Sequence, residues 1–235
     1  VNDVVLENYW DRSQPIFPAE QIELQSHGST LYFRNVFIRE IFTEEDGWSS
    51  LFDGESLSGW TGAVDGYHVE NGAIVSNPGS GGNLLTENEY ADFEFTFEFK
   101  LTPGANSGLG IRAPLKGNAA YDGMELQILD DSAQRYADLK PYQYHASIYG
   151  VVPAKRGFQK AVGEWNSQYV YVKGNRVRVE LNGVTIVDAD IKEASANGTA
   201  DGRKHPGLKK KSGHIGFLGH DSHVVFRKIY VREIK

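Results

Sequence analysis

Hydrophobic and polar positions alternate along much of this chain. The clearest example is FEFTFEFKL at residues 93–101, where four phenylalanines fall on one face of an extended strand and mostly charged side chains on the other. An alternation with a period of two residues is typical of an antiparallel strand with one buried face. By the same pattern we predict further strands at 108–113, 123–129, 168–173, 176–181, 184–187, 213–218 and 224–233.

Short turn sequences separate these segments. Lys173-Gly174-Asn175 and Asn182-Gly183 each join two alternating segments, and they contain residue types that accept the positive φ of a tight hairpin. Strands spaced by such turns are typical of a β-sandwich or barrel. We therefore predict an all-β protein, with one helical turn at residues 87–91 and a long mobile loop at residues 192–212.

The end of the chain repeats a phrase from near its beginning. Residues 21–41 read QIELQSHGSTLYFRNVFIREI, and residues 214–234 read HIGFLGHDSHVVFRKIYVREI without a gap. The spacing approaches the length of a domain and far exceeds the ~20–50 residues of a solenoid repeat. We interpret residues 1–41 as the C-terminal strands of a preceding sister domain, or as an N-terminal extension, and residues 48–235 as one complete domain. A single domain in which two similar strands pair is the alternative.

Composition excludes several classes of function. The net charge is −7, which argues against a nucleic-acid partner, because such proteins need a basic face. The chain has no cysteine, so disulfides and thiolate metal sites are absent. No apolar run approaches the ~18 residues of a membrane span. Aromatic residues at 12% and 26 glycines favour an all-β or carbohydrate-binding protein.

Two neighbouring predicted strands carry candidate chemistry. In PGANSGLGIRAP, at residues 103–114, Gly108 and Gly110 share a face with Arg112, which would leave a shallow floor beside a fixed cation close to Asn106. The alternative is a packing pair of glycines with an arginine that bridges a surface carboxylate.

The second strand lies within YDGMELQILDD, at residues 121–131. Glu125 and Gln127 point to the same side of this strand, ~6.6 Å apart along it, while Leu126 and Ile128 point to the other side. A carboxylate in an otherwise apolar strand costs free energy unless it is solvated, paired or functional. A solvent-facing acid and amide pair is the alternative to a site.

A third region, residues 144–166, contains His145, Tyr149, Glu164 and Trp165. An aromatic plane that stacks on a sugar ring, with fixed polar groups to read its hydroxyls, is what a carbohydrate site needs. The chain contains no recognisable metal motif. We expect no cofactor, although the sequence leaves a divalent metal open, and we expect His220 to be structural because His27 occupies its place in the repeat.

The chain resembles the bacterial 3-keto-disaccharide hydrolase family over residues 48–235. This resemblance implies a concanavalin-A-like jelly-roll β-sandwich of antiparallel strands, a hydrolase that acts on an oligosaccharide or 3-keto sugar, and export to the periplasm or cell surface. The motifs that carry it, in chain order, are LFDGESLSGW, NGAIVS, NLLTENEYADFEF, NSGLGIR, GMELQILD, SIYG, GEWN, LNGV and GHIGFLGH with VVFRKIYVREI.

A 3-keto sugar suggests a mechanism with one base. The carbonyl at C3 acidifies the hydrogen at C2, so the oxygen at C1 can leave by elimination, and water then adds. In this hypothesis Glu125 is the base, Arg112 stabilises the enolate, and Tyr149 or His145 protonates the leaving oxygen. The sugar would be held by Asn106, Gln127, Trp165 and Glu164.

Three alternatives remain at this stage. A conventional glycoside hydrolase needs two carboxyl groups, and the second would have to be Glu164 or Asp130 because Gln127 is an amide. A non-catalytic carbohydrate-binding module needs aromatic stacking without a base. A catalytically inactive copy would only pack against its sister domain.

Overall fold

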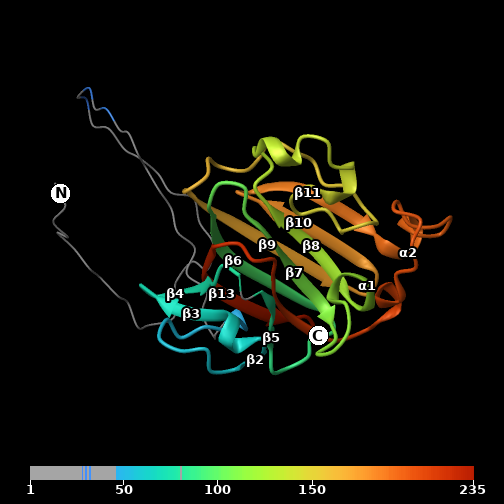
Figure 1. Ribbon diagram of the computed structural model, residues 1–235, viewed down its shortest axis with the longest axis horizontal. Helices are drawn as coiled ribbons and strands as arrows, with labels where there is room; N and C mark the ends of the chain where they lie inside the picture. The colour runs from blue at the N-terminus through green and yellow to red at the C-terminus, as the bar shows by residue number, and fades with distance from the viewer. Residues whose placement is uncertain (1–27, 29, 31, 33–45, 80) are drawn as a thin grey trace. The chain divides into compact units, whose positions relative to one another are not determined.

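A computed structural model describes residues 28, 30, 32, 46–79 and 81–235 of the chain (Figure 1). The chain divides into two compact units, Val1–Glu40 and Ile41–Lys235. The described residues of the second unit contain the strands and helices that follow. The prediction that residues 1–41 belong to a sister domain falls outside the described residues.

The described part of Ile41–Lys235 folds into two antiparallel sheets, as the all-β prediction required. The larger sheet has the order β11-β10-β9-β6-β13-β4-β3, with β1 paired to β13, and the smaller sheet has the order β2-β5-β12-β7-β8. The strands of the larger sheet are β1 Ser49–Ser50, β3 Tyr67–Glu70, β4 Ala73–Ser76, β6 Phe93–Leu101, β9 Trp165–Lys173, β10 Arg176–Leu181, β11 Val184–Asp190 and β13 Val224–Glu233. Those of the smaller sheet are β2 Trp60–Gly62, β5 Gly82–Thr86, β7 Asn106–Ala113, β8 Met124–Leu129 and β12 His214–Gly219.

Helical segments are short in the described residues. The α-helices are α1 Ala119–Asp122 and α2 Ile191–Ala194, and the 3₁₀ helices are η2 Val64–Gly66, η3 Gln134–Tyr136, η4 Pro141–Gln143 and η5 Pro206–Lys209. The helical turn predicted at residues 87–91 is wrong, since this segment holds bends and an isolated bridge instead. The segment at residues 192–212 contains the end of α2 and all of η5, which packs against α1.

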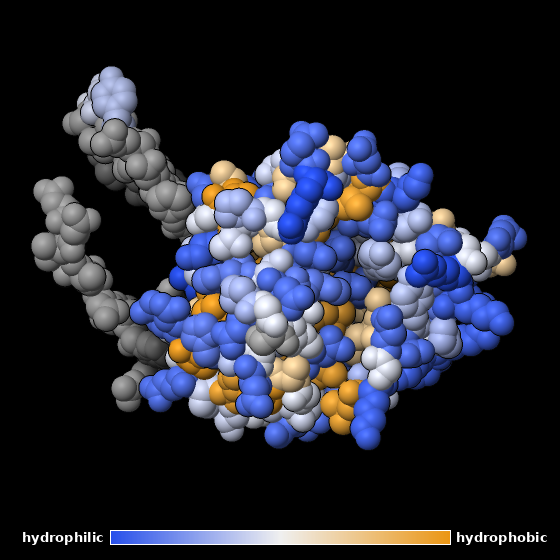
Figure 2. All heavy atoms as spheres, in the orientation of Figure 1, coloured by the Kyte–Doolittle hydropathy of each residue, from blue (hydrophilic) through white to orange (hydrophobic). Residues whose placement is uncertain are grey.

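The core lies between the two sheets. The phenylalanines of β6 are buried, as their alternation predicted. Phe217 of β12 and Phe226 of β13 stack at 3.7 Å between ring centroids, so the smaller and larger sheets meet through these rings. On the face shown in Figure 2, hydrophilic residues cover most of the surface and hydrophobic residues form separate small patches. Within the described residues, no helix is long and apolar enough to cross a membrane.

The predicted hairpin turns take the expected backbone. Gly174 has φ +55°, and Asn182 and Gly183 have φ +51° and +83°. These turns join β9 to β10 and β10 to β11, so residues 165–190 form one continuous meander in the larger sheet.

An irregularity in β7 matters for the candidate site. Opposite β12, the partners change from Gly216 with Gly110 to His214 with Ala113, so β7 contains one extra residue there. Arg112 lies in this bulge with φ +47°. A bulge interrupts the alternation of faces, which is why Arg112 does not share a face with Gly108 and Gly110 as predicted.

Candidate active site

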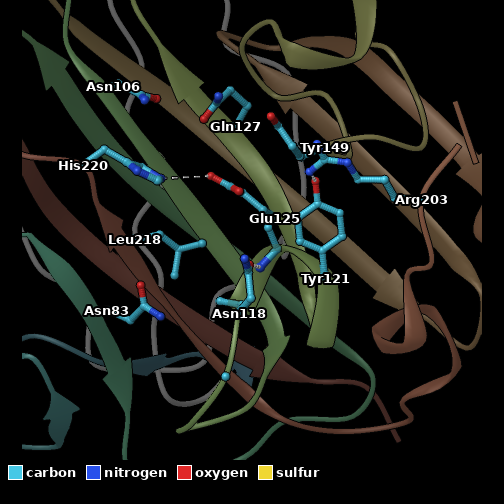
Figure 3. Close-up of a pocket in the computed structure, with 13 residues that line it drawn as sticks. Asn83, Asn106, Asn118, Tyr121, Glu125, Gln127, Tyr149, Arg203, Leu218 and His220 are labelled. Carbon is cyan, nitrogen blue, oxygen red and sulfur yellow. Dashed lines mark hydrogen bonds and ion pairs between the residues drawn. The ribbon is translucent and has the colours of Figure 1, made fainter. Parts of the chain in front are cut away.

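A cavity of about 570 Å³ opens on the outer face of the smaller sheet. It forms there because β8 alternates: Leu126 and Ile128 enter the core, which leaves Glu125 and Gln127 on the opposite face. Strands supply the floor, whereas α1 and the connecting segments that carry Asn118, Tyr149, Arg203 and His220 supply the walls (Figure 3). The lining residues are Asn83, Asn106, Gly117, Asn118, Ala119, Ala120, Tyr121, Glu125, Gln127, Tyr149, Arg203, Leu218 and His220.

Glu125 is the central ionisable group of this floor. Its residue is only 5% exposed, and its Oε1 accepts no hydrogen bond from the described residues, although an ion pair with His220 lies just beyond hydrogen-bond distance. The carboxylate fits because Gly108, on the neighbouring strand, has no side chain: a Cβ atom there would overlap the Glu125 carboxylate. A buried acceptor that receives no hydrogen bond is costly, so this oxygen is suited to meet a group that enters the cavity beside His220.

His220 lies beside Glu125 and was not predicted as a site residue. Its Nε2 is 3.6 Å from Glu125 Oε1, and its side chain is 46% exposed (Figure 3). The Glu125 carboxylate raises the pKa of His220 above its usual value, against the partial burial of the ring, and Asp221 adds to this rise. In the sequence repeat, His27 occupies the place of His220, which suggested a structural role for His220. However, His220 follows Leu218 by two residues, so both side chains point to the same side and line the cavity.

The opposite wall is aromatic. The rings of Tyr121 and Tyr149 meet edge to face at 6.5 Å between centroids. Tyr121 Oη accepts a hydrogen bond from Arg203 Nη1 at 2.9 Å and donates one to Asp201 Oδ2 at 3.5 Å. Tyr149 Oη accepts a hydrogen bond from Gln143 Nε2 at 3.2 Å. The proton of Tyr121 therefore has an acceptor in the protein, whereas no described hydrogen bond uses the proton of Tyr149.

Four amide side chains, Asn83, Asn106, Asn118 and Gln127, also line the cavity. Asn106 is held through its backbone N–H, which donates to Ser222 Oγ at 3.0 Å, while its Oδ1 is buried without a partner. Gln127 Oε1 accepts a 3.2 Å hydrogen bond from the backbone N–H of Ile128. The amide nitrogen of Gln127 thus remains the group with which it can contact a ligand.

Four of the eight predicted site residues meet in this cavity: Asn106, Glu125, Gln127 and Tyr149. Sequence reasoning missed His220, Tyr121 and Arg203 as lining residues. Tyr121 precedes the predicted strand by a few residues, and Arg203 lies in the segment predicted to be a loop. These side chains come together only when the loops have folded, so no local sequence pattern predicts that they share a site.

Arg112 lies outside the cavity, contrary to the prediction. Its side chain is 1% exposed and forms an ion pair with Asp92 Oδ1 at 3.1 Å. Its guanidinium also donates to the backbone oxygens of Ala91, Gly174 and Lys210, at 2.8–3.2 Å. Arg112 is thus a cross-link between β7 and three other segments, produced by the bulge that turns its side chain away.

His145 also lies away from the cavity, in the interior. It is 3% exposed, and its ring packs against Phe99 at 5.1 Å between centroids. Burial lowers the pKa of His145 to about 3. Its Nδ1 accepts a hydrogen bond from the backbone N–H of Leu129 at 3.4 Å. A neutral histidine enclosed in the core cannot reach a leaving group in the cavity.

Trp165 and Glu164 lie elsewhere as well. Trp165 begins β9 in the larger sheet, with Lys100 Nζ at 4.9 Å and the Arg227 guanidinium at 3.8 Å from its ring centroid. Glu164 is exposed and accepts a hydrogen bond from the backbone N–H of Ala161 at 3.2 Å. Neither residue lines the cavity on the smaller sheet, and neither does Asp130.

The described side chains offer little support for a metal centre. Within residues 46–79 and 81–235, no group of three or more histidine, aspartate or glutamate side chains is placed to hold an ion.

Known proteins resemble this chain over most of its length. Residues 47–232 match the family described as the 3-keto-alpha-glucoside-1,2-lyase-like domain. The chain belongs to this family. The resemblance predicted from the sequence motifs is thereby confirmed. A relative, a 3-keto-disaccharide hydrolase of Bacteroides thetaiotaomicron, is 26% identical to this chain in an alignment of 229 residues that covers 80% of this chain and 79% of the relative.

Solved structures agree with the 3-keto-alpha-glucoside-1,2-lyase-like fold. Two Parabacteroides distasonis proteins, described provisionally as glycosyl hydrolases, align with TM-scores of 0.72 and 0.70. They are 25% and 28% identical to this chain, and the alignments cover 83% and 80% of it and 99% of each relative. The jelly-roll sandwich is therefore shared with experimentally determined structures.

Proposed function

We propose that this protein cleaves the glycosidic bond of 3-keto sugars by elimination at C1 and C2, followed by addition of water. Family membership and the hydrolase from Bacteroides thetaiotaomicron support the substrate class. The observation that carries the mechanism is Glu125, a buried carboxylate in a polar cavity whose Oε1 faces His220 Nε2 at 3.6 Å and accepts no hydrogen bond from the described residues.

The cavity favours elimination over ordinary glycoside hydrolysis. The ordinary reaction needs two carboxyl groups, ~5–5.5 Å apart for retention or ~6.5–9.5 Å apart for inversion. Among the described residues that line the cavity, Glu125 is the single carboxylate. A 3-keto sugar needs one base, because its carbonyl makes the hydrogen at C2 acidic.

The first step transfers a proton. Glu125 takes the hydrogen from C2, and the electron pair of the C2–H bond forms a C2–C3 double bond while the C3 oxygen becomes negative. The enolate then collapses, the bond from C1 to the glycosidic oxygen breaks, and that oxygen takes a proton. Water then adds its oxygen to C1 of the resulting enone, its released proton restores the donor that protonated the leaving oxygen, and C2 regains a proton from Glu125, so the net reaction is hydrolysis.

Tyr149 is the proton donor that we assign to the leaving oxygen. Its Oη accepts from Gln143, which leaves its own proton for a ligand. Tyr121 is less suited to this role, because its proton points to Asp201. The roles first considered for Arg112, His145, Trp165 and Glu164 are not part of this proposal, since these residues lie outside the cavity.

A paired substrate assay in deuterated water tests the proposal. We expect a 3-keto-disaccharide to be cleaved with deuterium incorporated at C2, and its unoxidised parent to remain intact. Glu125→Gln should slow cleavage by about 10²–10⁴-fold, whereas Glu164→Gln, which removes an exposed carboxylate elsewhere, should act like the wild type. Cleavage of the parent sugar would contradict elimination. Binding of the keto sugar without turnover would indicate a carbohydrate-binding module.

Export to the periplasm or cell surface, and a sister domain upstream, stay predictions from the sequence.

A further inference from the structure

We propose that His220 donates the hydrogen bond and positive charge that stabilise the enolate at the C3 oxygen, the role that the sequence suggested for Arg112. This inference rests on the proposed elimination. It makes His220 a catalytic residue, although the repeat in the sequence indicated a structural one.

The position of His220 relative to the base supports this role. Enolisation needs a base above C2 and a donor at the oxygen on C3, which is the adjacent carbon. His220 Nε2 lies 3.6 Å from Glu125 Oε1, so the two groups reach adjacent atoms of one sugar ring. Both line the same cavity, and Figure 3 shows the His220 ring directed at the Glu125 carboxylate.

The other cations near the sheet are less suitable. Arg203 is the second cationic side chain in the described lining, but it is exposed and donates to Tyr121. Figure 3 shows it on the opposite side of Glu125 from His220. Arg112 is enclosed, with its donors directed to other partners.

The charge balance also favours His220. Two carboxylates act on its imidazole, Glu125 from β8 and Asp221 from the adjacent position, and both favour the protonated ring. During proton transfer the negative charge moves from Glu125 to the C3 oxygen. The imidazolium keeps an anionic neighbour throughout, so the reaction never leaves an isolated charge in the cavity. Fixed positive charge at the atom where negative charge develops is often the largest single catalytic term.

The step is balanced within the described groups. The proton from C2 goes to Glu125, the electron pair goes to the C3 oxygen, and His220 keeps its own proton. When the enolate collapses, the C3 carbonyl forms again and the C2–C3 π electrons form a C1–C2 double bond. The electron pair of the broken C1–O bond leaves with the glycosidic oxygen, to which Tyr149 supplies a proton.

The test separates enolisation from bond cleavage in the full chain. Exchange of the C2 hydrogen is followed by NMR in deuterated water with a methyl 3-keto-glucoside, and methanol release is followed in parallel. We expect His220→Gln to slow both rates by the same factor, about 10²–10³-fold, with substrate affinity changed only a few-fold. His223→Gln is the matched control, because His223 does not line the cavity around Glu125 but a separate pocket with Trp165, and this variant should behave like the wild type.

Two further measurements distinguish catalysis from structure. Added imidazole should partly restore the activity of His220→Ala, and circular dichroism should show that this variant is folded. The wild-type rate should fall at high pH as His220 loses its proton, and this fall should be absent in His220→Gln.

Two outcomes in His220→Gln would overturn the assignment, and two in other proteins would overturn what it rests on. Normal C2 exchange with slow methanol release in His220→Gln would place His220 at the leaving group. Normal rates of both would remove it from the reaction. Wild-type protein that neither exchanges nor cleaves the keto sugar would overturn the proposed function itself, and a full rate in Glu125→Gln would overturn the choice of base.

Discussion

Glu125 occupies the floor of the cavity because the neighbouring strand has no side chain at Gly108. We predict that Gly108→Ala displaces the carboxylate, since the new Cβ atom would overlap it. The kcat for 3-keto-disaccharide cleavage should fall at least 10-fold, roughly the effect of a small misplacement of a catalytic group. Gly110→Ala is the matched control: its Cβ would meet the flexible end of Leu218 at 3.1 Å, so a smaller loss is expected. Equal losses would show that Gly108 has no special relation to Glu125.

His145 gives the protein a specific sensitivity to acid. In the unfolded chain its pKa is near the usual 6.5, whereas in the folded protein burial lowers it to about 3. Between these values the unfolded state binds a proton that the folded state does not, so stability falls as the pH is lowered. We predict that this residue alone lowers the free energy of unfolding by about 3 kcal/mol between pH 7 and pH 4.5.

Urea unfolding at both pH values measures this effect. His145→Gln should lose less stability on acidification than the wild type does, whatever its stability at pH 7. The same substitution at His68, an exposed histidine, should keep the wild-type dependence. An unchanged acid loss in His145→Gln would show that other groups dominate.

Alternation along the strands was sufficient to predict the face of Glu125 and Gln127. It failed for Arg112, because one extra residue in β7 reversed the direction of its side chain. It also gave no information on His220 and Arg203, which follow or lie between regular elements. Side-chain direction is periodic only inside a regular strand, so the groups around a cavity's rim depend on tertiary contacts.

At the scale of elements, Arg112 connects the β7 bulge to the β9–β10 turn and to two loops. We predict that Arg112→Lys lowers the free energy of unfolding by about 3 kcal/mol, because an ammonium group cannot reproduce the fork that contacts Asp92, Ala91, Gly174 and Lys210. Thermal unfolding measures the loss. The folded fraction, assayed well below the melting temperature, should retain most of its kcat. A large loss of kcat with unchanged stability would return Arg112 to a catalytic role.

Strand positions were more predictable than connections. The segment expected at 176–181 matches β10 and that at 224–233 matches β13, because both carry clear alternation and end at turn residues. The segment at 192–212 has little periodicity, yet it supplies η5 and places Arg203 and His205 against Tyr121. The structure of this segment depends on contacts with α1, and a local sequence pattern cannot predict such contacts.

At the scale of the whole molecule, the two sheets depend on a shared aromatic contact. Phe217 stacks on Phe226 across the core and also contacts Trp60 and Phe97. We predict that Phe217→Ala lowers the free energy of unfolding by about 3–5 kcal/mol, and that tryptophan fluorescence and circular dichroism still report one transition. Two separate transitions would indicate that the sheets unfold independently. Phe158→Ala, at a half-exposed loop position, serves as the control.

The cavity is built from two kinds of structure. Its proposed base lies on β8, which pairs with β7 on one side and is hydrogen-bonded to residues 146–149 on the other, whereas Arg203 and Tyr149 come from connections between elements. Substitutions, insertions and deletions accumulate more readily in connections than in paired strands. Over evolution, the sugar or aglycone accepted by related proteins is therefore expected to diversify first through the segment around Arg203, which has no step in the proposed chemistry. Tyr149 and His220 also lie in connections, but the proposed bond-breaking step depends on them. A designer who wishes to redirect this scaffold to another glycoside should vary the segment around Arg203 and keep these two residues, β7 and β8.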